Sequence, residues 1–407
     1  MGSPLEGVVV LDLTRVLSGP MCCVILEDLG AEVLKIEMPE TGDDSRAYGP
    51  YINKQSLYFM TANRGKKSID LNLKTQGGKE ILKALVKKAD VLVENYRPGV
   101  MEKLGLGYDV LKEINPRLIY AGISGFGITG PDRGRAAYDV LVQAESGLMS
   151  ITGIEGQPPV RVGYSVSDIN GALFCAIGIN AALYQREKTG LGQRIDIAML
   201  DCQLSVLESA LSRYIVTGQS PKPLGHRHPT ITPFQAFKAK DHWFAIAAGN
   251  DNLFARLCDV IGKPQLVSDP RFVTNWERSQ HLDEIGKEIQ EVVETDEMQN
   301  WIDKLNEVGV PCAPVNDMSM VVKDRQLIAR NMFVKCQDPY AGDVTVPGNP
   351  IKMSTIEEKT TRVAPPQVGQ HRAEILAKYT DFTADQIAEF TQQGTFTKAG
   401  KPLEGAK

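Results

Sequence analysis

Apolar positions follow two different patterns along this chain. In the first half, short continuous apolar runs alternate with longer segments in which apolar residues recur at helical spacing. Continuous runs are typical of strands buried on both faces, and their alternation with helices predicts a mainly parallel sheet covered on both sides. The predicted strands are residues 8–13, 32–37, 68–73, 90–94, 117–123 and 194–198.

The helices predicted between these strands, and the elements beyond them, suggest a second and smaller region. Residues 18–30, 79–89, 171–183 and 200–216 show helical spacing, the last as one long amphipathic helix. Residues 217–229 contain three prolines and are predicted to be a linker. The pattern then predicts a hairpin over 234–248 and helices over 252–262, 281–295 and 298–308. Strands and turns near 344–350 and helices over 373–378 and 384–392 follow.

These patterns predict an α/β protein with a large Rossmann-like domain and a small α+β domain. We expect the large domain over 1–216, the linker over 217–229 and the small domain over 230–320. Residues 321–407 are expected to form a linker and a C-terminal return to the large domain. A chain of 407 residues is long enough for more than one hydrophobic core.

Composition narrows the classes of function. The net charge of −5 argues against a broad nucleic-acid surface. No run of eighteen apolar residues is free of charge, and no secretory signal is visible, so we expect a cytoplasmic protein with no membrane span. The seven cysteines lack CxxC spacing, which favours buried thiols over disulfides or zinc.

The most informative candidate for chemistry is Asp168, which stands just before the small and apolar segment 171–183. A carboxylate at a helix start is favoured by backbone N–H groups and by the helix dipole. We therefore expect Asp168 to remain ionised at neutral pH. The local sequence leaves open whether Asp168 is an N-cap or a nucleophile.

Other motifs point to chemistry less strongly. Gly125–Gly130 matches GxGxxG, but Pro131 and a turn follow it instead of a helix, which argues against a nicotinamide site. His226 and His228 lack clustered acidic or cysteine partners, so we expect no metal. Lys74 and Arg97 follow predicted strands, where they could meet phosphates or simply be solvated surface charges.

Six segments distributed along the chain form a recognisable set. They are LEGVVVLDLTRVLSGP (5–20), LGAEVLKIEMPETGDDSR (29–46), VLVENYRPGVMEKLGLGYD (91–109), ISGFGITGP (123–131), AAYDVLVQAESGLMSITG (136–153) and GLGQRIDIAMLD (190–201). Together with the segment around Asp168, they resemble the class III coenzyme A transferases, the formyl-CoA/carnitine-CoA transferase family, over nearly the whole chain. The match looks closest to the acetyl-CoA:oxalate CoA-transferase branch, notably in residues 49–59, 224–229 and 346–354.

This resemblance implies both an assembly and a mechanism. Family members are homodimers whose two subunits interlock as rings. The family nucleophile is an aspartate at the position of Asp168, and catalysis passes through an aspartyl anhydride and an aspartyl-CoA thioester. Coenzyme A is a substrate, so no permanently bound cofactor is expected. The positions that match coenzyme A contacts are Val16, Leu17, Ser18, Leu71, Asn72, Leu73, Lys74, Asn95, Tyr96, Arg97, Lys103, Ala136, Ala137, Tyr138 and Asp139.

The resemblance therefore predicts a transferase that moves coenzyme A from acetyl-, formyl- or succinyl-CoA to a small carboxylic acid. Oxalate is the best acceptor hypothesis, and another dicarboxylate such as succinate is an alternative. By match to the close branch, His226 and Arg227 are candidates to bind the acceptor. Gly249, in the only segment near the position of the family's glycine-rich gating loop, is a third candidate.

The chain also departs from the family pattern at named positions. Formyl-CoA transferase has Arg where this chain has Met38 and Lys103, and this chain has no tetraglycine loop. A racemase of the same superfamily remains an alternative function. Its catalytic histidine corresponds to Tyr138, and a phenol, which ionises near pH 10, is a poor replacement as a base.

Overall fold

Residues 2–397 are described by a computed structural model, in which the apolar runs of the first half pair into one parallel sheet. The order of its strands is β5-β2-β1-β6-β7-β8. Numbered along the chain within the sheet, this is 3-2-1-4-5-6, the order of a doubly wound nucleotide-binding sheet. The predicted mixed α/β class is therefore confirmed. The strands are β1 (Val9–Asp12), β2 (Glu32–Glu37), β5 (Lys67–Asp70), β6 (Val91–Glu94), β7 (Ile119–Ser124) and β8 (Arg194–Ala198).

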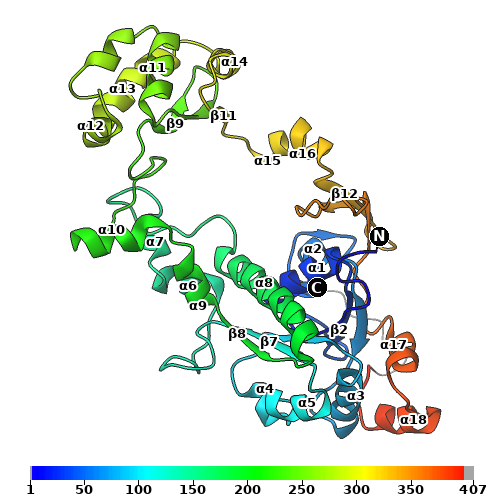
Figure 1. Cartoon of the computed structure of the whole chain (residues 1–407). Helices are drawn as coiled ribbons and strands as arrows, with labels where there is room; N and C mark the ends of the chain where they lie inside the picture. Colours follow the sequence, from blue (N-terminus) through cyan, green and yellow to red (C-terminus); the bar gives the residue numbers. More distant parts are fainter. Residues whose placement is uncertain (1, 398–407) are drawn as a thin grey trace. The chain divides into compact units, whose positions relative to one another are not determined.

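Helices cover both faces of this sheet, because neighbouring apolar residues in each strand point to opposite sides. Val10 packs in one core and Leu11 in the other. On the face of Val10 lie α1 (Ser18–Asp28), α6 (Asp139–Glu145), α8 (Val166–Thr189) and α9 (Met199–Ser205). On the face of Leu11 lie α3 (Gln76–Val86), α5 (Tyr108–Ile114), α17 (Arg372–Tyr379) and α18 (Ala384–Gln392) (Figure 1).

The helix α8 packs most extensively against α1 and carries Asp168 in its first turn. By length and composition alone it could cross a membrane. Ala172, Cys175 and Ile179 on one side of it are nevertheless buried in the core. The eighteen-residue criterion passed over this segment because Asp168 and Arg186 interrupt the apolar run.

The described residues separate into two compact units. Within residues 2–397, the first consists of residues 2–148, Arg161–Leu211 and residues 325–397, and the second of Met149–Val160 and Ser212–Asp324. The expected boundary differs for residues 149–160, which the sequence reading placed in the large domain. They join the second unit because Ile154 forms an antiparallel bridge with Leu224.

The second unit is built on a three-stranded antiparallel sheet with the order β11-β10-β9. The predicted hairpin and helices are present, and β11 is an additional strand that the sequence pattern did not reveal. The elements are β9 (Phe234–Lys238), β10 (Trp243–Ala247), α11 (Asp251–Val260), η2 (Pro264–Ser268), α12 (Asn275–Gln280), α13 (Leu282–Val293), α14 (Met298–Glu307), β11 (Cys312–Pro314) and α15 (Met318–Val321).

After the second unit the chain returns to the first. A small sheet of order β13-β12-β14 packs Val334 and Cys336 against Met60. Ile375, Phe390 and Phe396 then complete the core beneath the parallel sheet. The elements are α16 (Arg325–Ala329), β12 (Phe333–Asp338), β13 (Gly342–Pro347) and β14 (Thr361–Val363).

The single helix predicted over 200–216 is wrong. The structure has two helices, α9 and α10 (Ser209–Thr217), separated at Glu208, whose φ is 54°. A left-handed backbone ends a right-handed helix. The apolar spacing continues across this break, so the pattern alone could not reveal it.

Several short elements complete the described chain. They are η1 (Asp44–Ala47), β3 (Tyr51–Ile52), β4 (Gln55–Ser56), α2 (Leu57–Asn63), α4 (Val100–Lys103) and α7 (Leu148–Ile151). All seven cysteines are free, and six of them are buried. The predicted buried thiols are therefore confirmed.

Candidate active site

Asp168 is the third residue of α8 and is half-buried. The N-cap residue is Ser165, whose side chain makes no capping hydrogen bond. Within residues 2–397, no hydrogen bond or ion pair to the Asp168 carboxyl is present. The alternative reading of Asp168 as an N-cap is therefore wrong, and its carboxyl is left without a structural partner.

The acidity of Asp168 also differs from the expectation. Burial, and then the charge of Asp139, raise the pKa of Asp168 to about 7. The position at a helix start was expected to keep this carboxyl ionised. It does not, because no cation or donated hydrogen bond among the described residues offsets the loss of solvent. The group therefore titrates near neutral pH.

Asp139 performs the capping that Asp168 does not. Its Oδ1 accepts the backbone N–H of Ser167 at 2.9 Å, and its Oδ2 accepts Nε2 of Gln143 at 2.7 Å. The side chain is buried, with 8% of the residue exposed. Asp139 was expected to contact coenzyme A, but its carboxylate is engaged inside the protein.

Two tyrosines near Asp168 were missed by the sequence reasoning. Burial and the charge of Asp168 raise the pKa of Tyr58 to about 12, so its phenol remains a hydrogen-bond donor. The ring of Tyr48 stands edge-on to that of Tyr58, with centroids 5.7 Å apart. Tyr58 lies in residues 49–59, which carry the resemblance, and Tyr48 lies just before them, but an isolated tyrosine gives no chemical signal in a sequence. Tyr138, which was predicted, is 73% exposed and is the N-cap residue of α6.

The turn after β1 and the turn after β6 meet at the point where the strand order reverses. The side chain of Asn95 pairs with the backbone of Arg15, accepting its N–H and donating to its C=O, both at 2.8 Å. Asn95 Nδ2 also reaches Ser18 Oγ at 3.5 Å. Ligands of doubly wound sheets bind at such a reversal. The structure thus brings together Asn95 and Ser18, two of the residues that the resemblance predicted.

Val16 sits in this turn with a φ of 68°. This conformation is strained for a β-branched residue. It is held in place because the Val16 N–H donates to Asp43 Oδ1 at 3.0 Å. The next residue, Leu17, is the N-cap of α1 and makes no side-chain cap.

Other predicted coenzyme A contacts of the first unit lie in the segments after β5, β6 and β7. Leu71 and Leu73 are buried in the core, so their side chains face away from solvent. Tyr96 is half-buried, and burial raises its pKa. Asn72 and Ala137 are half-exposed and Ala136 is exposed.

Three predicted cations differ from the other basic residues near the strand ends. Lys74, Arg97 and Lys103 are exposed, and none of their side chains forms a hydrogen bond or ion pair with another described residue. In contrast, four other basic side chains near the ends of these strands are paired internally. These are Arg46 with Glu37, Arg64 with Asp28, Lys66 with Asp12, and Lys67 with Glu32 and Glu374.

A fully buried ionic network supports the turn that contains Val16. Lys66 Nζ donates to Asp12 Oδ2 at 2.8 Å, and Lys35 Nζ lies 2.9 Å from Asp43 Oδ2. Burial alone would raise the pKa of Asp12, but the charges of Lys35 and Lys66 hold it below its usual range. No local sequence pattern indicated that these charges are internal.

The three acceptor candidates lie in the second unit. His226 is exposed near the ring of Trp243, and burial together with the charge of Arg227 lowers its pKa. Arg227 Nη1 lies 2.6 Å from Asp283 Oδ1. Gly249 accepts a hydrogen bond on its carbonyl from the buried Arg278 at 3.2 Å.

The segment over 247–251 is a short connection between β10 and α11. A Cβ at Gly249 would lie 1.9 Å from Cγ2 of Ile231, so only glycine fits there. The connection ends at Asn250, whose side chain accepts the N–H of Leu253 and caps α11.

The GxGxxG segment forms a loop, as its sequence indicated, and α6 begins only at Asp139. His228 Nδ1 accepts the backbone N–H groups of Thr230 and Ile231. No group of three or more metal-ligating side chains occurs in the described part of the chain.

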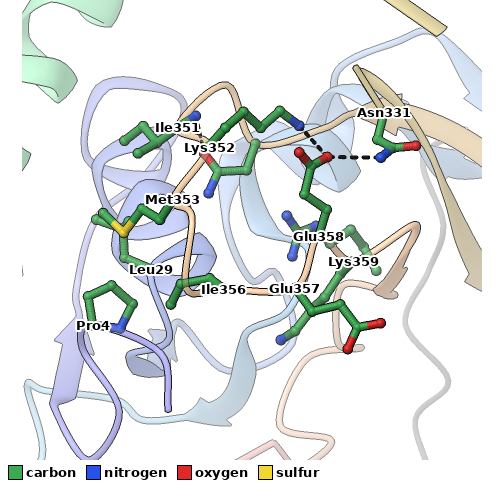
Figure 2. Close-up of a pocket in the computed structure, with 12 residues that line it drawn as sticks. Pro4, Leu29, Asn331, Ile351, Lys352, Met353, Ile356, Glu357, Glu358 and Lys359 are labelled. Atoms are coloured by element: carbon green, nitrogen blue, oxygen red, sulfur yellow. Dashed lines mark hydrogen bonds and ion pairs between the residues drawn. The ribbon is translucent and has the colours of Figure 1, made fainter. Parts of the chain in front are cut away.

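A cavity of about 40 Å³ lies in the first unit (Figure 2). It is far too small to hold an acyl-CoA. It contains none of the predicted site residues. Glu358 accepts hydrogen bonds there from Lys352 at 2.7 Å and Asn331 at 2.9 Å. We assign this cavity a structural role only.

Comparison with known proteins agrees with the geometry. The profile of CoA-transferase family III matches residues 5–372. The chain is 46% identical to the acetyl-CoA:oxalate CoA-transferase of Acetobacter aceti over 92% of its own length and 96% of that protein. It is 39% identical to human succinyl-CoA:glutarate CoA-transferase, over 96% of this chain and 89% of the relative. The crystal structure of a CAIB/BAIF family protein from Brucella suis is similar with a TM-score of 0.83 and 38% identity, covering 93% of this chain and 100% of that one.

Proposed function

Because the chain belongs to CoA-transferase family III, we propose that it transfers coenzyme A from an acyl-CoA to a small carboxylic acid, with Asp168 as the nucleophile. The observation that carries this proposal is the half-buried Asp168 carboxyl, which has no structural partner among residues 2–397 and has a pKa of about 7. A carboxylate of raised pKa is more basic, and hence more nucleophilic, than an ordinary one.

The reaction proceeds by four acyl transfers. The ionised Asp168 oxygen attacks the thioester carbon, the C–S bond breaks, and coenzyme A leaves as a thiolate. That thiolate attacks the Asp168 carbonyl of the mixed anhydride, releasing the donor acid and leaving an aspartyl-CoA thioester. The acceptor carboxylate attacks this thioester, and the thiolate leaves again. The thiolate finally attacks the acceptor carbonyl, which yields the new acyl-CoA and frees the Asp168 carboxylate.

The coenzyme A site is assigned to the edge of the sheet where the strands end. The paired turns of Val16–Ser18 and Asn95 provide a backbone cradle at the reversal of strand order. Lys74, Arg97 and Lys103 follow β5 and β6, have no side-chain partner among the described residues, and suit phosphate groups. Lys103 binds as a point charge, which compensates only in part for the missing arginine.

Oxalate is our best acceptor hypothesis, because the Acetobacter aceti relative is named for it. The human relative is named for glutarate, so a longer dicarboxylate such as glutarate or succinate is the alternative. His226, Arg227 and Gly249 are our candidates for binding the acceptor. Arg227 would have to exchange its contact with Asp283 for the acceptor carboxylate.

We also propose that the protein works in the cytoplasm as an interlocked homodimer. On the side of α8 opposite the core, Leu173 is 46%, Ile177 63% and Tyr184 67% exposed. Spacings of four and seven residues place these three side chains on one face of the helix. An apolar face of this kind is typical of a subunit interface. Light scattering on the purified protein would give a monomer mass if this proposal is wrong.

Replacing Asp168 by Ala tests the mechanism. We expect a fall in transfer of at least about 10⁴-fold, because the nucleophile is removed. Binding of coenzyme A, measured by calorimetry, should be unchanged. Hydroxylamine should convert Asp168 to a hydroxamate only while an acyl-CoA donor is turning over, which mass spectrometry can detect.

The matched control is Asp201→Ala, which removes an exposed carboxylate from the first turn of α9. Its activity should equal that of the wild type. Full transfer by the Asp168→Ala variant would contradict the proposal. A screen of oxalate, succinate and glutarate against acetyl-, formyl- and succinyl-CoA identifies the substrates. Exchange of the α-proton without any acceptor acid would instead support a racemase.

A further inference from the structure

The segment that leads into α8 is attached to α6 at two backbone groups. Gln143 Oε1 accepts the N–H of Val162 at 2.9 Å, and Asp139 Oδ1 accepts the N–H of Ser167 at 2.9 Å. These two bonds bracket the residues between Val162 and Ser167, the residue immediately before Asp168. The conformation of the first turn of α8 therefore depends on side chains of α6.

Asp139 is the centre of this attachment. Its second oxygen, Oδ2, accepts Gln143 Nε2 at 2.7 Å, and Arg161 Nη2 lies 3.9 Å away. The N-cap residue of α8, Ser165, leaves the helix start uncapped. A carboxylate placed at the second N–H of the helix replaces a conventional cap and suits the helix dipole.

We propose that Asp139 is a positioning residue, which holds the first turn of α8 so that the Asp168 carboxylate points at the acyl carbon of the substrate. This inference rests on the proposed role of Asp168 as the nucleophile. It gives Asp139 a task different from contact with coenzyme A, because both of its oxygens are engaged inside the protein.

The hydrogen-bond pattern requires a carboxylate at this position. Gln143 uses its oxygen for the Val162 N–H, so it must present its NH₂ group to residue 139. Residue 139 therefore needs two acceptors, one for Gln143 and one for the Ser167 N–H. Asparagine offers one acceptor and one donor and would leave a pair of donors facing each other. Asp139→Asn should consequently be damaging although it keeps the shape.

The experiment compares Asp139→Asn and Asp139→Ala with the wild-type protein. We expect kcat to fall about 100-fold in both, because a small misplacement of a reacting group has an effect of this size. The Kd for coenzyme A should stay within about twofold, since the cradle at Val16 and Asn95 is untouched. Asp385→Asn, which makes the same change in the first turn of α18, is the control.

Two further measurements separate positioning from general damage. Asp139→Glu, which keeps two acceptors, should recover part of the lost kcat. Among the described residues, the charged and titratable groups around Asp168 are Asp139, Tyr58 and, beyond Asp139, Arg161. Loss of the Asp139 charge should therefore move the acid limb of the kcat/KM profile to lower pH, which a purely structural defect would not do.

The outcomes distinguish this inference from the proposed function. Wild-type kcat in Asp139→Ala, together with an inactive Asp168→Ala, overturns the positioning role and leaves the nucleophile intact. Activity in both variants overturns the nucleophile itself. A raised Kd for coenzyme A at unchanged kcat would return Asp139 to a substrate contact. If the Asp139 variants do not fold, Gln143→Ala tests the same attachment, with an expected loss of kcat of roughly tenfold.

Discussion

Asp12 and Asp168 lie in the same unit but in opposite electrostatic surroundings. Asp12 has no exposed surface, yet Lys35 and Lys66 hold its pKa below the usual range. Asp168 is only half-buried, yet its pKa rises to about 7. Burial alone would raise both pKa values. The partners decide the outcome, because Asp12 has two ammonium groups beside it and Asp168 has only another carboxylate.

This difference separates a part of the chain whose charges stabilise the fold from one whose charge does not. Around Asp12, buried charges are paired, and the network supports the turn of Val16 through Asp43. At Asp168, a carboxyl is kept without a partner among the described residues. An unpaired carboxyl weakens the fold, and groups of this kind concentrate at reactive sites.

Removing the charge of Asp12, the paired carboxylate, should have the largest effect on the stability of the fold. Asp12→Asn leaves Lys66 buried with only neutral acceptors, Pro20 O and Asn63 Oδ1. We expect the free energy of unfolding to fall by about 3–5 kcal/mol, the usual result of removing one partner of a buried ion pair. Urea denaturation at pH 7 measures it.

The matched control for this loss is the double variant Asp12→Asn, Lys66→Met, which removes both charges. It should be more stable than Asp12→Asn alone, because no uncompensated ammonium group remains on Lys66. Equal stability of Asp12→Asn and the wild type would mean that the network does not act as a pair.

The unpaired Asp168 carboxyl predicts that kcat/KM depends on pH. A nucleophilic Asp168 must be ionised, so kcat/KM should be half-maximal near pH 7 and fall about tenfold for each unit below it. An ordinary carboxyl would instead titrate near pH 4. A kcat/KM profile that is flat between pH 5 and pH 8 would contradict the raised pKa.

Removing the charge of Asp168 should have the smallest effect, and of the opposite sign to Asp12→Asn. Because the folded pKa lies above the unfolded one, the protonated carboxyl favours the fold at low pH, and this contribution is lost as pH rises through about 7. Asp168→Asn avoids this loss. At pH 8 the variant should therefore be more stable by an amount on the order of 1 kcal/mol, reduced from the full linkage value because the group is partly solvated.

The stability gained in Asp168→Asn must also depend on pH. The gain from Asp168→Asn should shrink as pH falls from 8 to 5, because the wild-type carboxyl becomes protonated. Thermal unfolding at three pH values measures this. A gain that is constant with pH would mean that desolvation of the charge is not its origin.

Much of the fold could be predicted from sequence because its signals are local. Residues 32–37 and 194–198 were predicted with the bounds of β2 and β8, since each is a short β-forming run between turn signals. The break at Glu208 was not predictable, because it lies in the backbone angle of one residue within a continuing apolar pattern. The short strand β11 pairs with β10 from 65 or more residues away and has no periodicity of its own.

In the candidate site too, local features could be predicted from the sequence and long-range ones could not. The position of Asp168 could be recognised from its motif, but its acidity depends on Asp139, which comes from another helix. Lys66 stands beside another lysine in the sequence, whereas its partner Asp12 is 54 residues away. Pairings over such separations carry no local signal. Sequence reasoning could therefore propose candidate residues, but not the protonation state or the pairing of their side chains.

The second unit is inserted within the sequence of the first, and this determines the order in which the two units can be completed during synthesis. The second unit is complete once residue 324 has been synthesised. The first unit, although it contains the N-terminus, still lacks Ile375, Phe390 and Phe396 from its core at that moment. Domains fold as units during synthesis. The unit that begins first is thus finished last, and until then a nascent parallel sheet leaves part of one apolar face uncovered.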